Sequence, residues 1–491
     1  MKTDAEWKAW LADDGALPVV LAEVTVRVSG AGADTVRYLS TDNFVSAPTD
    51  TPANQKYEAL LSKDLTVNES LAIDSLVAAM SIGDIGITNR DGEQDDWLFD
   101  IWANRSIVLR CGDLRWTRDD MRIVFDGTNA DIGAKSRQEL GLKLRDKLLR
   151  LNASATEAKV AATGVSQDVL IPQPFGEVMN MTPVAIGPNE WQVSATPMEG
   201  ITEVRDNGVP VVFTQTVSTG KFTLNQAPEG AITCDVQGDK PAGVYINTVA
   251  KIIERLVTGF GKASDRFTTA DLDTAQLATF NTAHPQPVGF VITDRTNVLN
   301  VCRDLAGSVG AQVSMSRAGK LRLLKIQAPG TSKMTITATH MVEGSLTPTT
   351  RTDVVAAVKL GFSRNWTEQP GLTTGLSATD KEDLARKWSE AYDEDLTVAS
   401  IYKLSTEPVQ QDTMLLKRTH AEAEATRLLN LRKVPRTVYQ FTGYASLFDL
   451  ELGDTVTLQH SRFGLAAGVP GIVVSLNLSW ARRRVTVGVL I

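Results

Sequence analysis

The chain contains few of the side chains that build metal sites and nucleophilic sites. Among its 491 residues are only four histidines, at positions 284, 340, 420 and 460. None of them has the H-x-x-x-H or H-E-x-x-H spacing that places two imidazoles on one face of a helix. The sequence also lacks G-x-S-x-G, the signature of an α/β-hydrolase nucleophile. Neither a zinc hydrolase nor a serine hydrolase of that fold is supported.

Cysteine is scarcer still, with Cys111, Cys234 and Cys302 far apart and no C-x-x-C pair. This usage predicts reduced thiols in a protein assembled in a cytoplasm, with Cys302 in a helix core. A three-cysteine iron–sulfur site is a weaker alternative. We expect no cofactor, no metal ion and no catalytic residues.

Long apolar runs and excess positive charge are also missing. No apolar run approaches the roughly 18 residues that span a bilayer, and the polar N-terminus has no signal-peptide core. We therefore expect no secretory signal and no membrane span. The net charge of −8 argues against a general nucleic-acid binder, because binding phosphates needs clustered Lys and Arg. The local run Arg482–Arg484 is expected to be a solvated strand end or turn.

Two β-rich blocks are present, at residues 22–113 and 439–491. In the first, Val24, Val26 and Val28 alternate with polar residues, and the last residues of the chain, from Val485 to Ile491, alternate in the same way. Turn-forming clusters break the first block about every ten residues. Short strands with regular breaks are typical of antiparallel sandwiches or barrels.

The middle of the chain has a helical period. Apolar residues between Val249 and Phe260 recur at helical spacing and stop at Gly259 and Gly261, and a second helix is expected over Asn297–Gly307. Asn207-Gly208 supplies the positive φ angles of a tight β-hairpin turn. Further along, strands are expected at 334–338 and 354–362, and a helix over Thr413–Lys433.

These patterns predict a mainly β protein with an α+β middle: two antiparallel β-barrel or sandwich domains, a small α+β domain and a β-rich insert. The expected division is as follows: an N-terminal helical arm at 1–16, a first barrel at 17–150, a linker and hairpin insert at 151–241, an α+β domain at 242–329, and a second barrel at 330–491 with a helical insert at 365–433.

Several local patterns suggest chemistry and have simpler explanations. Asn89, Asp91, Glu93 and Asp95 alternate like calcium ligands but lack the distal Glu of an EF-hand, so a solvated turn is favoured. Residues 259–262 (GFGK) follow a helix instead of preceding one, which excludes a phosphate loop.

If the chain were a glycan hydrolase, Glu93, Asp95 and Asp96 would be the first candidates for its catalytic carboxylates. Trp97, Trp102 and Trp366 would be the platform of a carbohydrate-binding module, although core or interface positions are favoured.

Three stretches resemble the tail hub, or baseplate hub, family of long non-contractile bacteriophages and gene-transfer particles. The first stretch is YLSTDNFVSAPTDTPANQKY with the MSIGDIGITNRDGEQDDWLFDIWANRSIVLRCGD and RIVFDGTNADI segments after it. The second is PVGFVITDRTNVLNVCRDLAGSVGAQVSMSRAGKLRLLKI, and the third is ASLFDLELGDTVTLQHSRFGL with WARRRVTVGVLI. None of these motifs is a catalytic signature.

The resemblance implies a structural virion protein, not an enzyme, assembled in the host cytoplasm and located at the tail tip. In that family two tube-like barrels in one chain form a pseudo-hexameric ring as a trimer. The ring adapts the tail tube and distal-tail ring to the tip or fibres, and DNA and the tape-measure protein pass through its lumen without specific DNA binding. A distal-tail-type ring domain in a sixfold assembly is an open alternative, as is a virion-associated cell-wall or glycan hydrolase.

Overall fold

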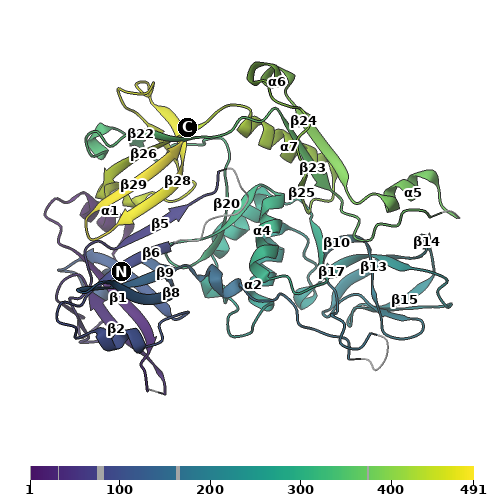
Figure 1. Cartoon of the computed structure of the whole chain (residues 1–491), viewed down its shortest axis with the longest axis horizontal. Helices are drawn as coiled ribbons and strands as arrows, with labels where there is room; N and C mark the ends of the chain where they lie inside the picture. Colours follow the sequence, from purple (N-terminus) through teal and green to yellow (C-terminus); the bar gives the residue numbers. More distant parts are fainter. Residues whose placement is uncertain (1, 31, 74–81, 162–165, 373–374) are drawn as a thin grey trace. The chain divides into compact units, whose positions relative to one another are not determined.

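The computed structural model describes residues 2–30, 32–73, 82–161, 166–372 and 375–491. These residues form two compact units, each built from stretches that are separated in sequence (Figure 1). Unit 1 comprises Met1–Leu149, Ser314–Thr352 and Pro435–Ile491, and unit 2 comprises Arg150–Val313 and Asp353–Val434. Both β-rich ends of the chain therefore belong to one unit.

Unit 1 is built almost entirely from strands. Its first part contains α1 (Asp4–Ala12), β1 (Pro18–Arg27), β2 (Asp34–Ser40), β3 (Phe44–Val45), β4 (Lys56–Tyr57), β5 (Thr66–Ser70), β6 (Ile82–Thr88), β7 (Ser106–Asp113), β8 (Arg122–Ser136) and β9 (Glu139–Arg145). Its later parts contain β20 (Leu321–Lys325), β21 (Thr335–Ile336), β22 (Thr347–Arg351), β26 (Thr437–Tyr444), β27 (Thr455–Leu458), β28 (Val469–Ser479) and β29 (Arg484–Leu490). Strand β19 (Ala311–Met315) lies where the chain passes from unit 2 into unit 1.

The first block closes into a barrel. Its strands follow the order β2-β1-β7-β8-β9-β6 in one sheet. Residues 58–62 then connect β6 back to β2. The Ser40 N–H donates to the Glu58 carbonyl at 2.7 Å, and the Thr88 N–H donates to the Leu60 carbonyl at 2.7 Å. Closure pairs the backbone groups that an open sheet would leave exposed at its edges.

The second block closes in a similar way. Strands β27, β28, β29 and β26 are neighbours, and residues 335–342 join the two ends. Strand β21 pairs with β27, and Met341 then lies opposite Gly443 of β26. The alternating residues predicted from the sequence form the inside of this barrel, since Val485, Val487 and Val489 are fully buried.

The two barrels are joined edge to edge within unit 1. Strand β5 pairs with β6 of the first barrel and with β28 of the second, where Ser70 lies opposite Ser475 and Val67 opposite Leu478. The result is one continuous hydrogen-bonded path from β2 to β22. The reason is that β5 has two sides with backbone donors and acceptors, and each barrel satisfies one of them.

Unit 2 combines three sheets with helices. The first two sheets are built from β10 (Gln173–Met181), β11 (Val184–Ala185), β12 (Glu190–Gln192), β13 (Met198–Asp206), β14 (Val209–Pro210), β15 (Phe213–Thr216), β16 (Lys221–Leu224), β17 (Ile232–Asp239) and β18 (Gly289–Ile292). The third contains β23 (Ala357–Phe362), β24 (Ser389–Glu394) and β25 (Gln411–Asp412). The helices are α2 (Val249–Gly259), α3 (Thr274–Ala283), α4 (Val298–Ser308), α5 (Ala378–Ala385), α6 (Leu396–Tyr402) and α7 (Arg418–Arg432).

The predicted mainly β class with an α+β middle is confirmed, and most central elements lie where the sequence placed them. Helices α2 and α4 match the expected ranges, and Asn207-Gly208 forms the turn between β13 and β14. Helix α7 begins at Arg418, five residues later than predicted. The physical reason is that Thr413 donates from its N–H and its hydroxyl to the Gly361 carbonyl, which holds residues 413–415 extended.

The two strands predicted around the start of the second barrel are shorter than expected. Only Thr335–Ile336 of the 334–338 segment is a strand, because Ala338–His340 turns as a 3-10 helix capped by Thr337. The strand predicted at 354–362 begins at Ala357.

Candidate functional site

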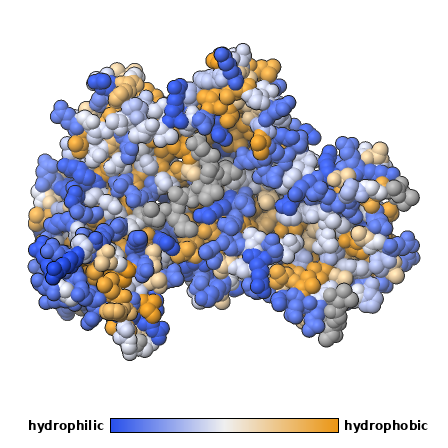
Figure 2. Space-filling model, viewed as in Figure 1, coloured by the Kyte–Doolittle hydropathy of each residue, from blue (hydrophilic) through white to orange (hydrophobic). Residues whose placement is uncertain are grey.

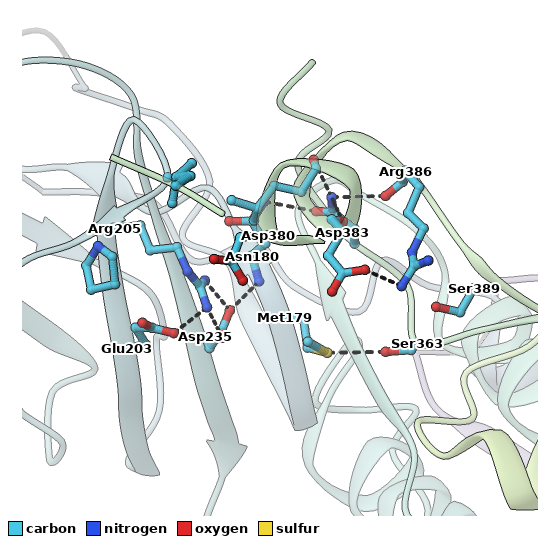
Figure 3. Close-up of a pocket in the computed structure, with 15 residues that line it drawn as sticks. Met179, Asn180, Glu203, Arg205, Asp235, Ser363, Asp380, Asp383, Arg386 and Ser389 are labelled. Carbon is cyan, nitrogen blue, oxygen red and sulfur yellow. Dashed lines mark hydrogen bonds and ion pairs between the residues drawn. The ribbon is translucent and has the colours of Figure 1, made fainter. Parts of the chain in front are cut away.

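A polar pocket in unit 2 is the first candidate for a functional site. It has a volume of about 470 Å³ and is bounded by β10, β13 and β17 on one side and by α5 and the residues after β23 on the other (Figure 3). Its walls carry charged groups of both signs: Glu203, Arg205, Asp235, Asp380, Asp383 and Arg386.

The acidic side chains on the sheet side are held by one arginine. Arg205 donates to both carboxylate oxygens of Asp235, at 2.7 and 2.6 Å, and also pairs with Glu203. Burial by itself lowers the pKa of Arg205, but its hydrogen bonds to Asp235 outweigh burial and raise that pKa above the usual value. Asp235 additionally accepts the Asn180 N–H at 2.6 Å. Its oxygens are therefore engaged, which does not suit a general base.

An amide network connects the two sides of the pocket. The Asn180 side chain donates to Asn365 Oδ1 at 3.0 Å and to the Thr367 carbonyl at 2.7 Å. Asn365 in turn donates to the Leu384 carbonyl at 2.8 Å, at the end of α5. Asn180 adopts a φ of +53°, which asparagine tolerates better than most residues. This network fixes α5 against β10.

The charged residues from α5 also have structural partners. Asp380 accepts from the Ser377 hydroxyl at 2.7 Å in a capping box at the start of α5, and Asp383 pairs with Arg386. The pocket thus presents ion pairs and a helix cap. Its arrangement stabilises unit 2 and does not assemble a nucleophile with a base.

The acidic turn predicted at 89–95 is held together by its own side chains. Asn89 donates to Asp95 Oδ1 at 2.7 Å and accepts the Gln94 N–H at 3.1 Å. Asp91, Glu93, Asp95 and Asp96 are all exposed. Across the described ranges, no cluster of three or more His, Cys, Asp or Glu side chains is arranged to hold a metal ion. The four carboxylates are thus exposed to solvent, whereas Asn89 is buried.

The predicted tryptophan platform is divided between the two units. Trp97 and Trp102 are buried in unit 1, and the Trp102 indole N–H donates to the Trp97 carbonyl at 2.8 Å. Trp366 is half-buried in unit 2, where it packs against a core cluster. For Trp97 and Trp102 the preferred prediction of a core position is confirmed.

The histidines and cysteines lie in separate places. His284 packs against Phe280, His340 accepts the Thr337 N–H, and His460 accepts the Arg462 N–H. All three cysteines are buried, and burial raises the pKa of Cys111 to about 12 and those of Cys234 and Cys302 above their usual value. Such thiols are poor nucleophiles.

Arg482 and Arg483 of the basic run lie in the turn between β28 and β29, and Arg484 begins β29, so the run is at a turn and a strand end as expected. It also has a structural role. Arg483 donates to the carbonyls of Leu11 at 2.7 Å and Asp13 at 2.8 Å, at the C-terminal end of α1. Arg482 pairs with Asp64. The sequence did not reveal these partners, because they are more than 400 residues away along the chain.

Exposed apolar residues mark two surfaces that the sequence analysis missed. In unit 1, Val36, Leu98, Phe99 and Ile101 are exposed around β2, and Phe99 keeps 74% of its surface accessible. In unit 2, α6 has no buried residue, and Leu396 and Ile401 are exposed along it. Hydrophobic side chains gather over both regions in Figure 2. Exposed apolar clusters of this kind are typical of protein contacts.

No described helix is long and apolar enough to cross a membrane. No protein-family model matches the sequence, and no curated protein matches it.

Several solved structures resemble the chain over most of its length. A tail protein from Neisseria meningitidis MC58 is 10% identical, with 97% of each chain covered and a TM-score of 0.44. The 43 kDa tail protein of prophage MuSo2 from Shewanella oneidensis is 10% identical, with 96% of this chain and 98% of that chain covered and a TM-score of 0.41. A chain of the native gene transfer agent particle is 10% identical, with 70% and 91% covered and a TM-score of 0.42.

Proposed function

We propose that this chain is a structural virion protein that forms the central hub at the distal end of a bacteriophage tail. The observation that carries the proposal is the pair of closed barrels in one chain, joined edge to edge through β5 and β28. A strand that pairs with two neighbouring barrels could hold a ring of barrels together. In this chain β5 pairs in this way with both barrels of the same chain. The sequence motifs shared with tail hubs support the same function.

Ring symmetry follows from the number of barrels. Three chains with two barrels each would supply six barrels, which would match a hexameric distal-tail ring and tail tube to a threefold tip. A closed ring also lets each subunit cover the exposed edges and apolar surfaces of its neighbour. The exposed residues around β2 and on α6 are candidates for these contacts and for contacts with the distal tail protein, the tape-measure protein and the tip or fibre proteins.

The proposed role is mechanical, not enzymatic. The ring would line the channel through which DNA and the tape-measure protein pass. With a net charge of −8, the chain would repel DNA phosphates and let DNA pass without adhering. The charged groups of the pocket in Figure 3 are engaged in ion pairs or, for Asp380, in a helix cap, which supports a structural role for that pocket.

Light scattering of the purified chain, with negative-stain imaging of the same fraction, tests the assembly. We expect a trimer, with three times the 53.1 kDa mass of one chain, and rings with a central hole. A sixfold ring would favour the distal-tail-type alternative. A monomer that also fails to enter tails in a particle-assembly reaction would contradict the proposal, and hydrolysis of purified cell walls by that monomer would favour a hydrolase.

A matched pair of variants tests the contact surface. Phe99→Glu places a charge among the exposed apolar residues around β2, whereas Val212→Glu changes an equally exposed residue of unit 2, and both positions are 74% exposed. We expect Phe99→Glu to reduce ring formation at least tenfold, and Val212→Glu to leave it unchanged. Equal ring formation by both variants would show that the exposed apolar surface around β2 is not part of the interface.

A further inference from the structure

The segment that follows β23 lines two different cavities of unit 2. Ser363 and Asn365 line the pocket of Figure 3, whereas Arg364 and Trp366 line a second cavity of about 210 Å³. The second cavity is also lined by β18 and by Asp304 and Leu305 of α4. None of the functional residues considered above except Trp366 lies in it.

Arg364 lies close to two indole rings. Its guanidinium carbon lies 3.8 Å from the centre of the Trp366 ring and 5.4 Å from that of Trp388. Cation–π contacts of this kind engage the face of a guanidinium and do not use its N–H groups as hydrogen-bond donors. In the described part of the chain Arg364 makes no hydrogen bond and no ion pair, and its Nε is buried without a partner.

Unit 1 contains the same arrangement with an acceptor in place. The guanidinium carbon of Arg37 lies 4.1 Å from the centre of Trp97 and 5.7 Å from that of Trp102. There, Asp100 provides a carboxylate oxygen 2.6 Å from Nη2 of Arg37, and the Asp100 side chain is only 4% exposed. The two arginines have similar ring distances and differ in whether a carboxylate pairs with the guanidinium, although Asp294 and Asp304 also line the cavity beside Arg364.

The other arginines over tryptophan rings follow the pattern of Arg37. Arg122 pairs with Asp4, Arg317 with Glu69, and Arg483 with backbone carbonyls. Within the described ranges, Arg364 alone among these five lacks an acceptor. Burial lowers the pKa of Arg364, and the charges of Asp412 and Glu368, which form no ion pair with it, only partly oppose this effect.

We propose that the cavity beside Arg364 binds the carboxylate of an aspartate or glutamate side chain from another polypeptide. The guanidinium edge matches a carboxylate with two parallel hydrogen bonds, and the indoles hold it in one orientation. A sugar acid fits less well, because Arg364 already lies over the Trp366 ring and Trp366 also packs against the core cluster, which leaves less of the ring free to stack on a pyranose. The site goes beyond the ring assembly proposed above and does not depend on it.

Peptide titration of the full chain labelled with ¹⁵N-tryptophan tests the proposal. The probe is acetyl-Gly-Glu-Gly-amide, the neutral control is acetyl-Gly-Gln-Gly-amide, and the sugar arm is glucuronate. The indole signals of Trp366 and Trp388 are assigned with Trp366→Phe and Trp388→Phe. We expect these two signals to shift saturably with the Glu peptide, with a Kd on the order of 1 mM, and not with the Gln peptide.

Substitutions of Arg364 distinguish a binding site from a stacking of Arg364 on the indoles that serves only the fold. Arg364→Gln should weaken the response at least tenfold, and Arg364→Lys, which keeps the charge, should weaken it less. Arg37→Gln is the matched control and should leave it unchanged. The remaining tryptophan signals report whether each variant is folded. Equal shifts with both peptides, or an undiminished response in folded Arg364→Gln, would overturn the proposal. Tighter binding of glucuronate than of the Glu peptide would overturn the assignment to a protein side chain.

Discussion

The indole N–H of Trp10 donates to Oδ2 of Asp113 at 2.9 Å, across 103 positions of sequence. This bond ties the N-terminal helix to the last residue of β7 in the first barrel. The same helix contacts the second barrel, because Trp7 lies 6.3 Å from Trp480 between ring centres and Arg483 binds the carbonyls at the end of α1. Helix α1 is therefore a brace between the two barrels of unit 1.

Removing the acceptor of this bond should destabilise unit 1. The Asp113 side chain is fully buried, and it also accepts the Leu17 N–H at 2.9 Å. Asp113→Ala would leave the buried indole N–H of Trp10 and the partly buried N–H of Leu17 unpaired, and we expect a loss of about 2–3 kcal/mol in the free energy of unfolding. Urea unfolding followed by tryptophan fluorescence measures this. Asp4→Ala, which removes an 85% exposed carboxylate on the same helix, should change stability by less than about 0.5 kcal/mol.

Asp113 should also contribute to acid sensitivity. Burial alone raises the pKa of Asp113, but hydrogen bonds from Arg115, Leu17 and Trp10 outweigh it and hold that pKa well below the usual range. A carboxyl group with a lowered folded-state pKa stabilises the fold above its unfolded pKa of about 4, and this stabilisation is lost as the pH falls toward the folded pKa. We expect the fall in Tm between pH 7 and pH 3 to be smaller in Asp113→Asn than in the wild type. An equal fall in both proteins would assign the acid sensitivity to other groups.

The sequence was sufficient to predict the position of those elements whose stabilising contacts are local. The helical period at 249–260 and the Asn207-Gly208 turn depend on neighbours within a few residues, and both elements are found where they were predicted. The start of α7 was misplaced because a contact between Thr413 and Gly361, 52 residues apart, holds the preceding residues extended. Periodicity carries no information about such a partner.

The same lack of information about distant partners explains why the sequence did not reveal the junction of the barrels or the environment of Arg364. The pairing of β5 with β28 joins residues about 400 positions apart, and no pattern within either strand indicates it. Arg364 and Trp366 are two residues apart, but their significance depends on Trp388 and on the lack, within the described chain, of a carboxylate paired with Arg364. Trp366 was selected from the sequence as an aromatic residue, whereas Arg364 gave no signal.

The junction of the two barrels depends on a buried ion pair. Arg317 lies 3.0 Å from Glu69 of β5 and donates to the carbonyls of Phe448 and Leu450, both at 2.7 Å. Arg317→Ala would leave the buried Glu69 carboxylate and two carbonyls without their partner, and we expect a loss of about 3–5 kcal/mol in the free energy of unfolding. Chemical denaturation of the full chain measures it.

An exposed pair near the same junction provides the comparison for Arg317. Lys8 pairs with Asp449 at 3.1 Å but is 57% exposed, so Lys8→Ala should cost less than about 1 kcal/mol. The double variant Arg317→Met with Glu69→Met should recover part of the loss, because no buried charge is then left alone. A loss for Arg317→Ala no larger than that for Lys8→Ala would show that the pair does not hold the junction.

The turn between β13 and β14 should require glycine for two separable reasons. Gly208 has a φ of +82°, a conformation that disfavours any side chain. An added Cβ would also lie 2.7 Å from Cδ1 of Leu372. Gly344 has a similar φ of +71°, and a Cβ there would meet nothing within 4 Å. Gly344→Ala should therefore lose only the backbone contribution of about 1 kcal/mol, and Gly208→Ala should lose more, about 2–3 kcal/mol in total. Thermal unfolding of the two variants beside the wild type measures both, and equal losses would mean that Leu372 moves aside at no cost.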